Sequence, residues 1–269
     1  LGIGMRKPRN GGLGLDVAGV VEAVGPEVGR FRPGDQVFGD MTQFGHGAYA
    51  ELVTAPAHAF APVPAGVSLE DAATTPQAAI LAIQGLDAQG GIKPGDKVLI
   101  NGASGSVGPF AVQIAKSRGA EVTGVASTKK LEFVRSLGAD HVLDYTRDDY
   151  TELGQRYDRI LDMAAYHSIG DIRRVLTRTG GYTAIGGSLV NVFGAMLVGV
   201  PMRLAGKQRA GLPMWKPFRA EDVVVVSRML ADGTIKPIID KRFPLAEVPD
   251  ALRYADDGHA RGKVVITVP

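Results

Sequence analysis

A short apolar run that enters a glycine-rich turn is the feature of this sequence that most restricts its fold. Residues 98–101 read Val-Leu-Ile-Asn, Gly102, Gly105 and Gly108 follow, and helical periodicity then begins. Glycines in such a turn let the backbone turn tightly, approach a pyrophosphate, and pack a helix against its strand. The new helix also offers unpaired N–H groups to phosphates. The pattern predicts a dinucleotide site. The alternative is an ordinary strand-to-helix turn, because 36 of the 269 residues are Gly.

Composition excludes several classes of function. Hydrophobic residues make up 45% and charged residues 22% of the chain, which is typical of a globular protein of one large or two modest domains. The net charge of +2 and the lack of long basic runs argue against a nucleic-acid partner. With no cysteine, the chain has no disulfide, thiolate nucleophile or cysteine-bound zinc.

Localisation signals are weak. No N-terminal segment has the layout of a signal peptide, so we expect a cytoplasmic protein. The longest apolar stretch, residues 189–204, contains Asn191 and Arg203 and is too short and interrupted for a membrane span. That stretch could line a substrate cleft, cover a dimer edge or touch a membrane, with core or interface packing the simplest interpretation.

The pattern of predicted elements changes along the chain. Short strand-like segments between turns come first, then a helical stretch, and then strands that alternate with helices, which is typical of βαβ units and a parallel sheet. The expected early strands are 17–24, 36–39, 48–54 and 60–63, followed by a helical region at 69–88. The expected alternating strands are 97–101, 121–126, 141–145, 159–163 and 181–185. A helix at 220–231, strands at 237–243 and 263–268, and a helix at 245–254 complete the prediction.

The end of the second alternating strand bears on the choice of coenzyme. In NAD sites a carboxylate about 20 residues past the glycines binds the ribose 2′-hydroxyl. Here residues 121–126 run into Ser127, Thr128, Lys129 and Lys130, with no acid at that position. A hydroxyl and two lysines suit a 2′-phosphate, so NADP(H) is favoured over NAD(H). The alternative is a helix capped by Ser127 with solvated lysines.

The histidines do not form a metal motif. They are His46, His58, His141, His167 and His259. No two have the i, i+4 spacing of a helical zinc site, so no metal is expected. Without a Lewis acid, nothing obvious stabilises an alkoxide, and hydride delivery to an activated enone or quinone is easier to explain than alcohol oxidation.

Six segments across nearly the whole chain carry a family resemblance. They are residues 14–25 (GLDVAGVVEAVG), 31–39 (FRPGDQVFG), 47–51 (GAYAE), the glycine turn, 137–145 (LGADHVLDY) and 258–265 (GHARGKVV). In this order they resemble the medium-chain dehydrogenase/reductase superfamily. Within it they are most similar to the zinc-free quinone oxidoreductases of the reticulon-interacting-protein-like branch.

The resemblance implies an α/β fold with two domains. Residues 1–80 and 235–269 would form a GroES-like β-barrel substrate domain, and residues 81–234 a Rossmann domain with a doubly wound parallel sheet that binds NADP(H). The chain starts with Leu, and the family's N-terminal barrel strands and Ser-x-Asn-x-x-Asp segment have no counterpart here. We therefore expect the GroES-like domain to be N-terminally incomplete.

The resemblance also assigns cofactor-binding residues. The pyrophosphate turn would comprise Gly102, Ser104, Gly105, Ser106, Val107 and Gly108. The 2′-phosphate and adenine would be surrounded by Ser127, Lys130 and Tyr145, and the nicotinamide would lie near Ile185, Gly186 and Gly187. Leu15-Asp16 stands where zinc-dependent members have His-Glu, and Leu81 replaces a threonine that approaches the cofactor in other members.

These observations predict an NADPH-dependent, zinc-independent reductase that transfers hydride to a quinone or an α,β-unsaturated carbonyl. Catalysis would rest mainly on positioning in a water-poor cleft. Tyr49 and Tyr166 could supply the proton, although each is more typical of a packing residue, so the catalytic residue stays unassigned. The alternatives are a non-catalytic NADPH-binding interaction protein and a metal-free alcohol dehydrogenase. By resemblance, a homodimer through the Rossmann sheet edge is expected.

Overall fold

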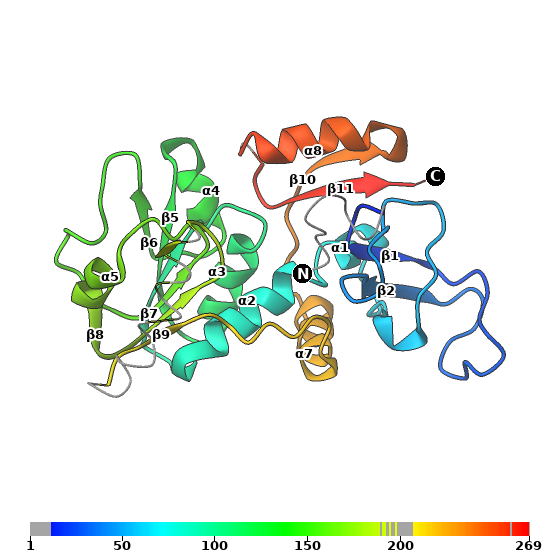
Figure 1. Ribbon diagram of the computed structural model, residues 1–269, viewed down its shortest axis with the longest axis horizontal. Helices are drawn as coiled ribbons and strands as arrows, with labels where there is room; N and C mark the ends of the chain where they lie inside the picture. Colours follow the sequence, from blue (N-terminus) through cyan, green and yellow to red (C-terminus); the bar gives the residue numbers. More distant parts are fainter. Residues whose placement is uncertain are drawn as a thin grey trace. The chain divides into compact units, whose positions relative to one another are not determined.

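The chain folds into two compact units in a computed structural model that describes residues 12–188, 190–191, 194, 197, 207–258 and 260–268 (Figure 1). The first unit comprises Leu1–Ile80 with Lys216–Pro269, and the second comprises Leu81–Trp215. His259 and most of the apolar stretch 189–204 lie outside the described residues, so the role predicted for that stretch stays a prediction.

The second unit is built on one six-stranded sheet whose paired strands are all parallel. Its strand order is β6-β5-β4-β7-β8-β9. The strands are β4 (Lys97–Asn101), β5 (Glu121–Ala126), β6 (His141–Asp144), β7 (Tyr157–Asp162), β8 (Leu176–Ala184) and β9 (Arg209–Gly211). Val98, Leu99 and Ile100 of β4 are fully buried, as expected of a strand covered on both faces. The predicted Rossmann sheet is confirmed.

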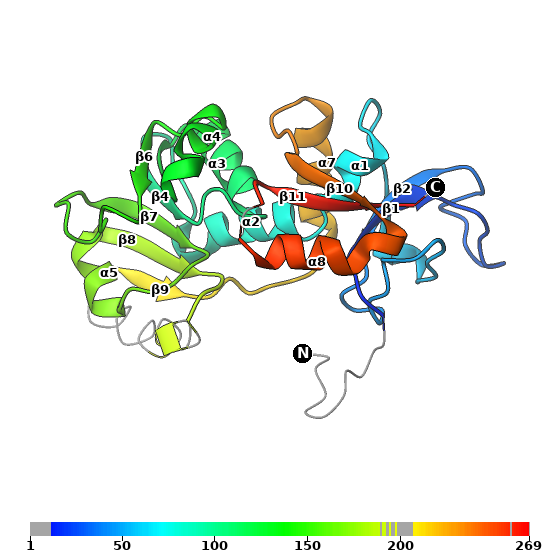
Figure 2. The ribbon, with the colours of Figure 1, turned by 90° about the horizontal axis from the view of Figure 1, so that it is seen from above.

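The strand order reverses between β4 and β7. From β4 the chain adds β5 and β6 on one side, and it then adds β7, β8 and β9 on the other. Right-handed crossovers therefore place α3 (Gly108–Ser117) and α4 (Leu131–Ser136) on one face and α5 (Ile169–Val175) on the opposite face (Figure 2). In doubly wound sheets, ligands bind outside the carboxyl ends of the strands at this reversal. The glycine turn lies directly after β4.

In the second unit, α5 begins at a side-chain cap. Ser168, before α5, accepts a hydrogen bond from the Asp171 amide at 3.3 Å. This unit also contains α2 (Ala78–Asp87), which starts in the first unit, and the 3₁₀ turns η2 (Ala88–Gly90) and η3 (Thr128–Lys130). The core between helices and sheet includes Leu99, Tyr157, Ile160, Ile172, Leu176 and Tyr182, all at most 2% exposed.

The first unit contains two small sheets. One is antiparallel, in the order β1-β2-β3, and the other pairs β10 with β11 in parallel. The strands are β1 (Asp16–Val20), β2 (Gln36–Asp40), β3 (Phe60–Pro62), β10 (Ile239–Pro244) and β11 (Lys263–Thr267). The helical elements are η1 (Ala57–Ala59), α1 (Leu69–Ala73), α7 (Ala220–Ala231), η4 (Leu245–Glu247) and α8 (Val248–Asp256).

Two features of the first unit differ from the sequence-based expectation. The segment 48–54 is not a strand, because it pairs with no strand among the described residues. The sequence also assigned residues 216–234 to the dinucleotide-binding domain, whereas the structure groups them with the first unit. Here Phe218, just before α7, packs its ring edge-on against the buried Phe38 ring of β2, with centroids 5.7 Å apart.

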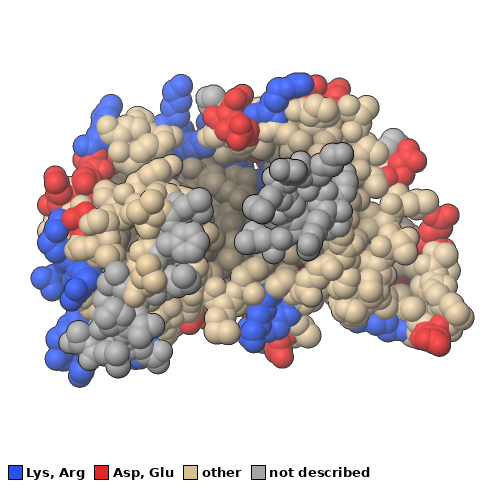
Figure 3. Space-filling view, in the orientation of Figure 1, with Lys and Arg blue, Asp and Glu red and all other residues tan. Residues whose placement is uncertain are grey.

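The surface carries both signs of charge. Figure 3 shows basic and acidic side chains interspersed around the periphery of one face. This distribution agrees with the small net charge of +2. None of the helices formed by the described residues is both long and apolar enough to cross a membrane.

Candidate functional site

The turn after β4 folds tightly against β5. The amides of Gly102 and Ala103 both donate to the carbonyl of Val125, at 3.2 and 3.0 Å, and the Gly105 amide donates to the Gly102 carbonyl at 3.1 Å. Gly102 has a φ of +85°, a conformation that L side chains rarely adopt. Since Val125 is on the neighbouring strand, these bonds hold the turn at the carboxyl edge of the sheet.

Gly108 is where this turn leaves no room for a side chain. A Cβ there would lie 2.4 Å from the carbonyl carbon and oxygen of Ala103 and 2.5 Å from the Gly102 oxygen. Gly108 begins α3, and Pro109 occupies its first turn, a position where a missing N–H costs nothing. The close backbone packing therefore sets the start of the helix directly above the turn.

The start of α3 has the properties of an anion site. Val107 is its N-cap and supplies no side-chain capping bond. Within the described part of the chain, no backbone hydrogen bond outside helices and strands uses the amide of Ser106 or Val107 as donor. Ser104 is buried, whereas Gly105 and Ser106 are exposed. The turn thus presents amides and the positive end of a ten-residue helix to any anion above it.

A buried carboxylate joins β4 and β7 at the point where the strand order reverses. Asp162 is 0% exposed and lies in register with Asn101, whose Nδ2 donates to it at 2.8 Å. It also accepts the Tyr182 hydroxyl at 3.1 Å and the Ala164 amide at 3.0 Å. Burial raises the pKa of Asp162, against the lowering effect of these donors. This cluster was not predicted, because its one local signal in the sequence is an acid at the end of an apolar strand.

The residues predicted to lie near the nicotinamide are hydrogen-bonded to the end of β7, at the carboxyl edge of the sheet. Ile185 donates its amide to the Asp162 carbonyl at 2.8 Å, and the Gly186 carbonyl accepts the Ala165 amide at 3.1 Å. Gly187 has a φ of +106°, and a Cβ there would lie 2.2 Å from the Ala165 nitrogen. The structure thus brings residues 185–187 beside the end of β7. Their role toward a cofactor stays a prediction.

The loop after β5 contains the residues predicted to recognise a 2′-phosphate. Ser127 and Lys130 are partly buried, Lys129 is exposed, and the Lys130 amide donates to the Ser127 carbonyl at 2.8 Å. Tyr145 follows β6 with 63% of its surface exposed, and its amide donates to the Ala126 carbonyl at 3.2 Å. The loops after β5 and β6 therefore lie side by side, as the predicted adenosine site requires.

A carboxylate outside residues 127–130 lies between these two loops. Asp144 ends β6 in register with Ala126, and Thr128 donates its hydroxyl to it. Thr146 adds a hydroxyl bond of 2.7 Å and an amide bond of 3.0 Å, and Arg147 lies 3.7 Å away. No acid occupies residues 127–130, but strand pairing brings this one to them. Its oxygens are already engaged by these groups.

The hydrogen bonds to Asp144 have a consequence for acid stability. The Thr128 hydroxyl, and then Thr146, hold the pKa of Asp144 below its ordinary value of 3.8, against the opposing effect of burial. A depressed pKa stabilises the folded state only while the carboxylate is ionised, so this contribution is present above pH 3.8 and is lost as pH falls through the folded pKa. We expect Thr128→Val to lower the free energy of unfolding at pH 7, with the difference from wild type shrinking below pH 3.8.

Urea titrations followed by circular dichroism, at pH 7 and at a pH below 3.8, measure this effect. Ser136→Ala is the control, because the Ser136 hydroxyl donates to the Phe133 carbonyl at 2.7 Å and touches no titrating group. Its effect should not depend on pH. A Thr128→Val difference that stays constant between neutral and acid pH would contradict the assignment.

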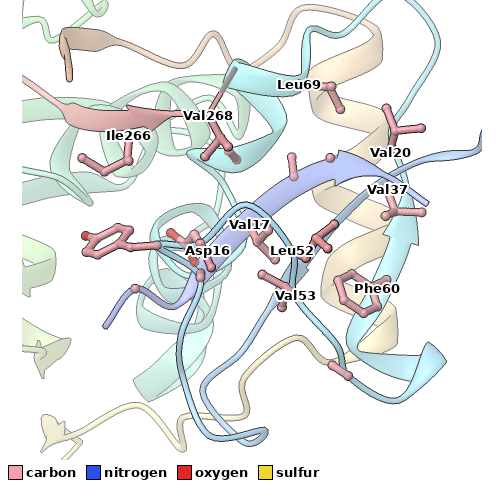
Figure 4. Close-up of a pocket in the computed structure, with 18 of the residues that line it drawn as sticks. Asp16, Val17, Val20, Val37, Leu52, Val53, Phe60, Leu69, Ile266 and Val268 are labelled. Atoms are coloured by element: carbon pink, nitrogen blue, oxygen red, sulfur yellow. The ribbon is translucent and has the colours of Figure 1, made fainter. Parts of the chain in front are cut away.

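The first unit contains an apolar groove of about 1110 Å³. Figure 4 shows Asp16 and Val17 near one end, Val20, Val37 and Phe60 near the other, and Leu52 and Val53 between them. In the described residues, β1 pairs only with β2 and β11 only with β10, so both strands have a side without a partner strand. The groove combines an extended run of apolar side chains with a polar group that contains Asp16, Gln77 and Lys263.

The polar group is organised around Asp16, which stands where zinc-dependent relatives would have glutamate. Its carboxylate contacts Lys263 Nζ at 3.1 Å and accepts the Gln77 amide at 3.0 Å. Burial raises the pKa of Asp16, against the lowering effect of Lys263. Burial, and then the charge of Asp16, also raise the pKa of Tyr49. Among the described residues, no three His, Cys, Asp or Glu side chains gather as a metal site.

The two tyrosines considered as proton donors have different surroundings. Tyr49 lines the groove close to Asp16, whereas Tyr166 is 76% exposed in the second unit. Leu81, which replaces the threonine of other members, is partly buried in α2. The structure gives neither tyrosine a contact that marks it as an acid, so the catalytic residue stays unassigned.

A glycine-rich turn at the reversal of a doubly wound sheet, together with a second small β unit, is the arrangement expected of two-domain nicotinamide oxidoreductases. Two family models match the chain: "Alcohol dehydrogenase GroES-like domain" over residues 4–65 and "Zinc-binding dehydrogenase" over residues 137–266. The first match confirms the predicted GroES-like domain.

Individual relatives agree with this class. The chain is 32% identical to the mouse "NAD(P)H oxidoreductase RTN4IP1, mitochondrial", over 95% of this chain and 70% of the relative. It is also 32% identical to the Arabidopsis thaliana "Chloroplast envelope quinone oxidoreductase homolog", over 93% of this chain and 78% of the relative. Among solved structures, a quinone oxidoreductase from Coxiella burnetii superposes with a TM-score of 0.83 at 28% identity, over 96% of this chain and 80% of that one.

The chain belongs to the medium-chain dehydrogenase/reductase superfamily, with quinone oxidoreductases among its relatives. It is an oxidoreductase that uses a nicotinamide cofactor. The resemblance inferred from the six sequence segments is thereby confirmed. The names of the mouse and Arabidopsis relatives place those two proteins in mitochondria and the chloroplast envelope, and the cytoplasmic location expected for this chain stays a prediction.

Proposed function

We propose that this protein is an NADPH-dependent, zinc-independent reductase that transfers hydride to a quinone or an α,β-unsaturated carbonyl. The observation that carries the proposal is the pair of adjacent loops after β5 and β6, which contain Ser127, Lys130 and Tyr145, while the glycine turn is bonded to β5 at Val125. In a dinucleotide site of this topology, that position contacts the adenosine ribose. Lysine and hydroxyl groups there suit a phosphate better than a free 2′-hydroxyl.

The shape of the turn fits a dinucleotide. Gly102 and Gly108 hold the backbone where a Cβ would meet neighbouring groups, and this lets the turn and the amides of Ser106 and Val107 approach a pyrophosphate. Ser127 and Lys130 would hold the 2′-phosphate, and Tyr145 would pack on the adenine. Residues 185–187 would lie beside the nicotinamide ring, which supplies the hydride when the cofactor is bound.

Asp144 is compatible with NADPH despite its charge. An NAD-type carboxylate must accept the ribose 2′-hydroxyl, and this requires an available oxygen. The oxygens of Asp144 already accept from Thr128 and Thr146 and lie near Arg147. The carboxylate is therefore better suited to holding the two loops than to binding ribose.

Zinc independence is supported by the partners of Asp16. A carboxylate that ligates zinc must direct an oxygen at the metal, whereas Asp16 is engaged by Lys263 and the Gln77 amide. An ammonium beside it also disfavours a second cation. Hydride transfer to a conjugated acceptor needs less help from a metal than the oxidation of a simple alcohol does.

The choice of acceptor rests on chemistry and on the names of relatives. Besides the quinone oxidoreductases, the chain is 32% identical to the tomato (Solanum lycopersicum) "2-methylene-furan-3-one reductase", of which it covers 62%. It superposes on "CurK enoyl reductase" with a TM-score of 0.80 at 28% identity, over 97% of this chain and 80% of that one. The apolar groove of the first unit suits an apolar acceptor. The homodimer expected from the resemblance stays a prediction.

Substitution of Lys130 tests which coenzyme the protein prefers. We expect Lys130→Ala to weaken NADPH binding by about 10- to 100-fold, because a charge-assisted bond to phosphate contributes about 1.5–3 kcal/mol. NADH binding should stay the same, since NADH lacks the 2′-phosphate. Fluorescence titration with each coenzyme measures both affinities.

Lys93→Ala is the matched control for this experiment. Lys93 is an exposed lysine in the turn before β4, at the opposite edge of the sheet. Its removal should leave both affinities unchanged. If Lys130→Ala bound NADPH as tightly as wild type, the assignment of the 2′-phosphate site would be wrong.

Turnover assays separate the proposed reaction from the two alternatives. The wild-type protein with NADPH should reduce at least one member of a panel of quinones and enones. Tight NADPH binding without reduction of any acceptor would favour a non-catalytic binding protein. Alcohol-dependent reduction of NADP⁺ would instead favour a metal-free alcohol dehydrogenase.

A further inference from the structure

Arg147 is a cation near the predicted 2′-phosphate site that neither the sequence motifs nor the family resemblance identified. It follows β6 by three residues, and 74% of its side chain is exposed. Its Nε lies 3.7 Å from Asp144 Oδ2, and its amide donates to the Asp144 carbonyl at 3.0 Å. The backbone of Arg147 is therefore fixed by a hydrogen bond and its guanidinium lies near the Asp144 carboxylate, while most of the side chain is accessible to a ligand.

Asp144 and two threonines bring this arginine to the loop after β5. The Thr128 and Thr146 hydroxyls lie 3.3 Å apart, and both contact the Asp144 carboxylate. Arg147 directly follows Thr146, and Thr128 lies between Ser127 and Lys130 in the chain. The guanidinium and the predicted phosphate-binding residues thus flank one hydrogen-bonded cluster.

The positive charge of Arg147 offsets the negative charge of Asp144 beside the predicted phosphate site. The Asp144 carboxylate would repel a phosphate bound to the neighbouring loop, and a cation beside it offsets that repulsion. A guanidinium is suited to phosphate because its planar array of donors matches the phosphate oxygens. An arginine held at 3.7 Å by one oxygen retains donors for a second anion.

We propose that Arg147 is a specificity-determining residue that supplies a further positive charge to the 2′-phosphate of NADPH. Asp144 is the positioning residue that holds Arg147 and joins the two loops. The proposal rests on the NADPH preference proposed above and adds a residue to it. It predicts that coenzyme discrimination depends on the loop after β6 as well as on the loop after β5.

Calorimetric titration with 2′,5′-ADP and 5′-AMP tests the proposal without turnover, because the two nucleotides differ only in the 2′-phosphate. Wild type should bind 2′,5′-ADP more tightly. We expect Arg147→Ala to weaken 2′,5′-ADP binding about fivefold with 5′-AMP unchanged, an effect reduced by the exposure of the site. Arg147→Lys should recover part of the loss, and Arg147→Glu should weaken binding further.

Arg174→Ala is the matched control. Arg174 pairs with Asp171 three residues earlier, the same spacing as Arg147 and Asp144, and its side chain is 65% exposed. Equal affinity of Arg147→Ala and wild type for 2′,5′-ADP would overturn the role of Arg147 while leaving the NADPH preference intact. An equal loss for both nucleotides would also overturn it. If wild type did not distinguish the nucleotides, the NADPH preference itself would fail.

Discussion

Replacing Gly108 by alanine is expected to weaken NADPH binding by about 100-fold or more, because losing two charge-assisted amide–phosphate bonds at about 1.5–3 kcal/mol each removes roughly 3 kcal/mol or more. The new Cβ would overlap the backbone of Ala103 and Gly102 at 2.4–2.5 Å. Backbone cannot rotate away as a flexible side chain can, so the turn or the start of α3 must move. Fluorescence titration with NADPH measures the loss, and circular dichroism reports whether the fold persists.

A glycine substitution without this overlap provides the control. Gly170 lies in α5, and the nearest group to a Cβ there is Ser168 Oγ at an ordinary 3.5 Å. Gly170→Ala should therefore bind NADPH like wild type. Wild-type affinity in a folded Gly108→Ala protein would show that the turn does not position the coenzyme.

Replacing Asp162 by alanine is expected to reduce the free energy of unfolding of the second unit by roughly 3–5 kcal/mol, because each buried polar group left without a partner costs about 1–3 kcal/mol. The substitution removes the acceptor of Asn101 Nδ2, the Tyr182 hydroxyl and the Ala164 amide. It also loosens the junction of β4 and β7 beneath the glycine turn. Scanning calorimetry measures the change in the transition of this unit.

Two further variants make the Asp162 result specific. Asp162→Asn keeps the size of the side chain and can still accept from Asn101, so it should lose less stability than the alanine variant. Asp148→Ala removes an exposed carboxylate of the same unit and should change stability by about 0.5 kcal/mol at most. Wild-type stability in Asp162→Ala would mean that the cluster contributes nothing to the fold.

Much of the second unit could be predicted because its signals are local. The bounds of β4 and β5 coincide with the predicted 97–101 and 121–126, since buried strands appear as apolar runs between turn residues. In the first unit, the bounds of α7 also match the predicted 220–231. The three-residue strand β9 was not predicted. It is defined by pairing with β8, and so short a segment carries no periodicity of its own.

The first unit was harder to predict because strand formation there depends on partners. Residues 48–54 have the composition of a strand, yet they line the groove without pairing as one, and Leu52 is 70% exposed. The domain boundary was missed for a similar reason. Residues 216–234 follow the parallel sheet in sequence, but the contact of Phe218 with Phe38 associates them with the first unit.

By itself, the sequence determined the glycine turn, the dinucleotide-binding fold and the basic loop at 127–130, because each depends on residues close together in the chain. Only the tertiary structure decided which distant groups complete the site. Asp162 is hydrogen-bonded to Asn101, 61 residues away in the chain, and Asp144 to Thr128, 16 residues away, because strand order and register bring each pair together. The same pairing brings Arg147 to the loop after β5. A local pattern cannot show such contacts, since they follow from which strands are neighbours.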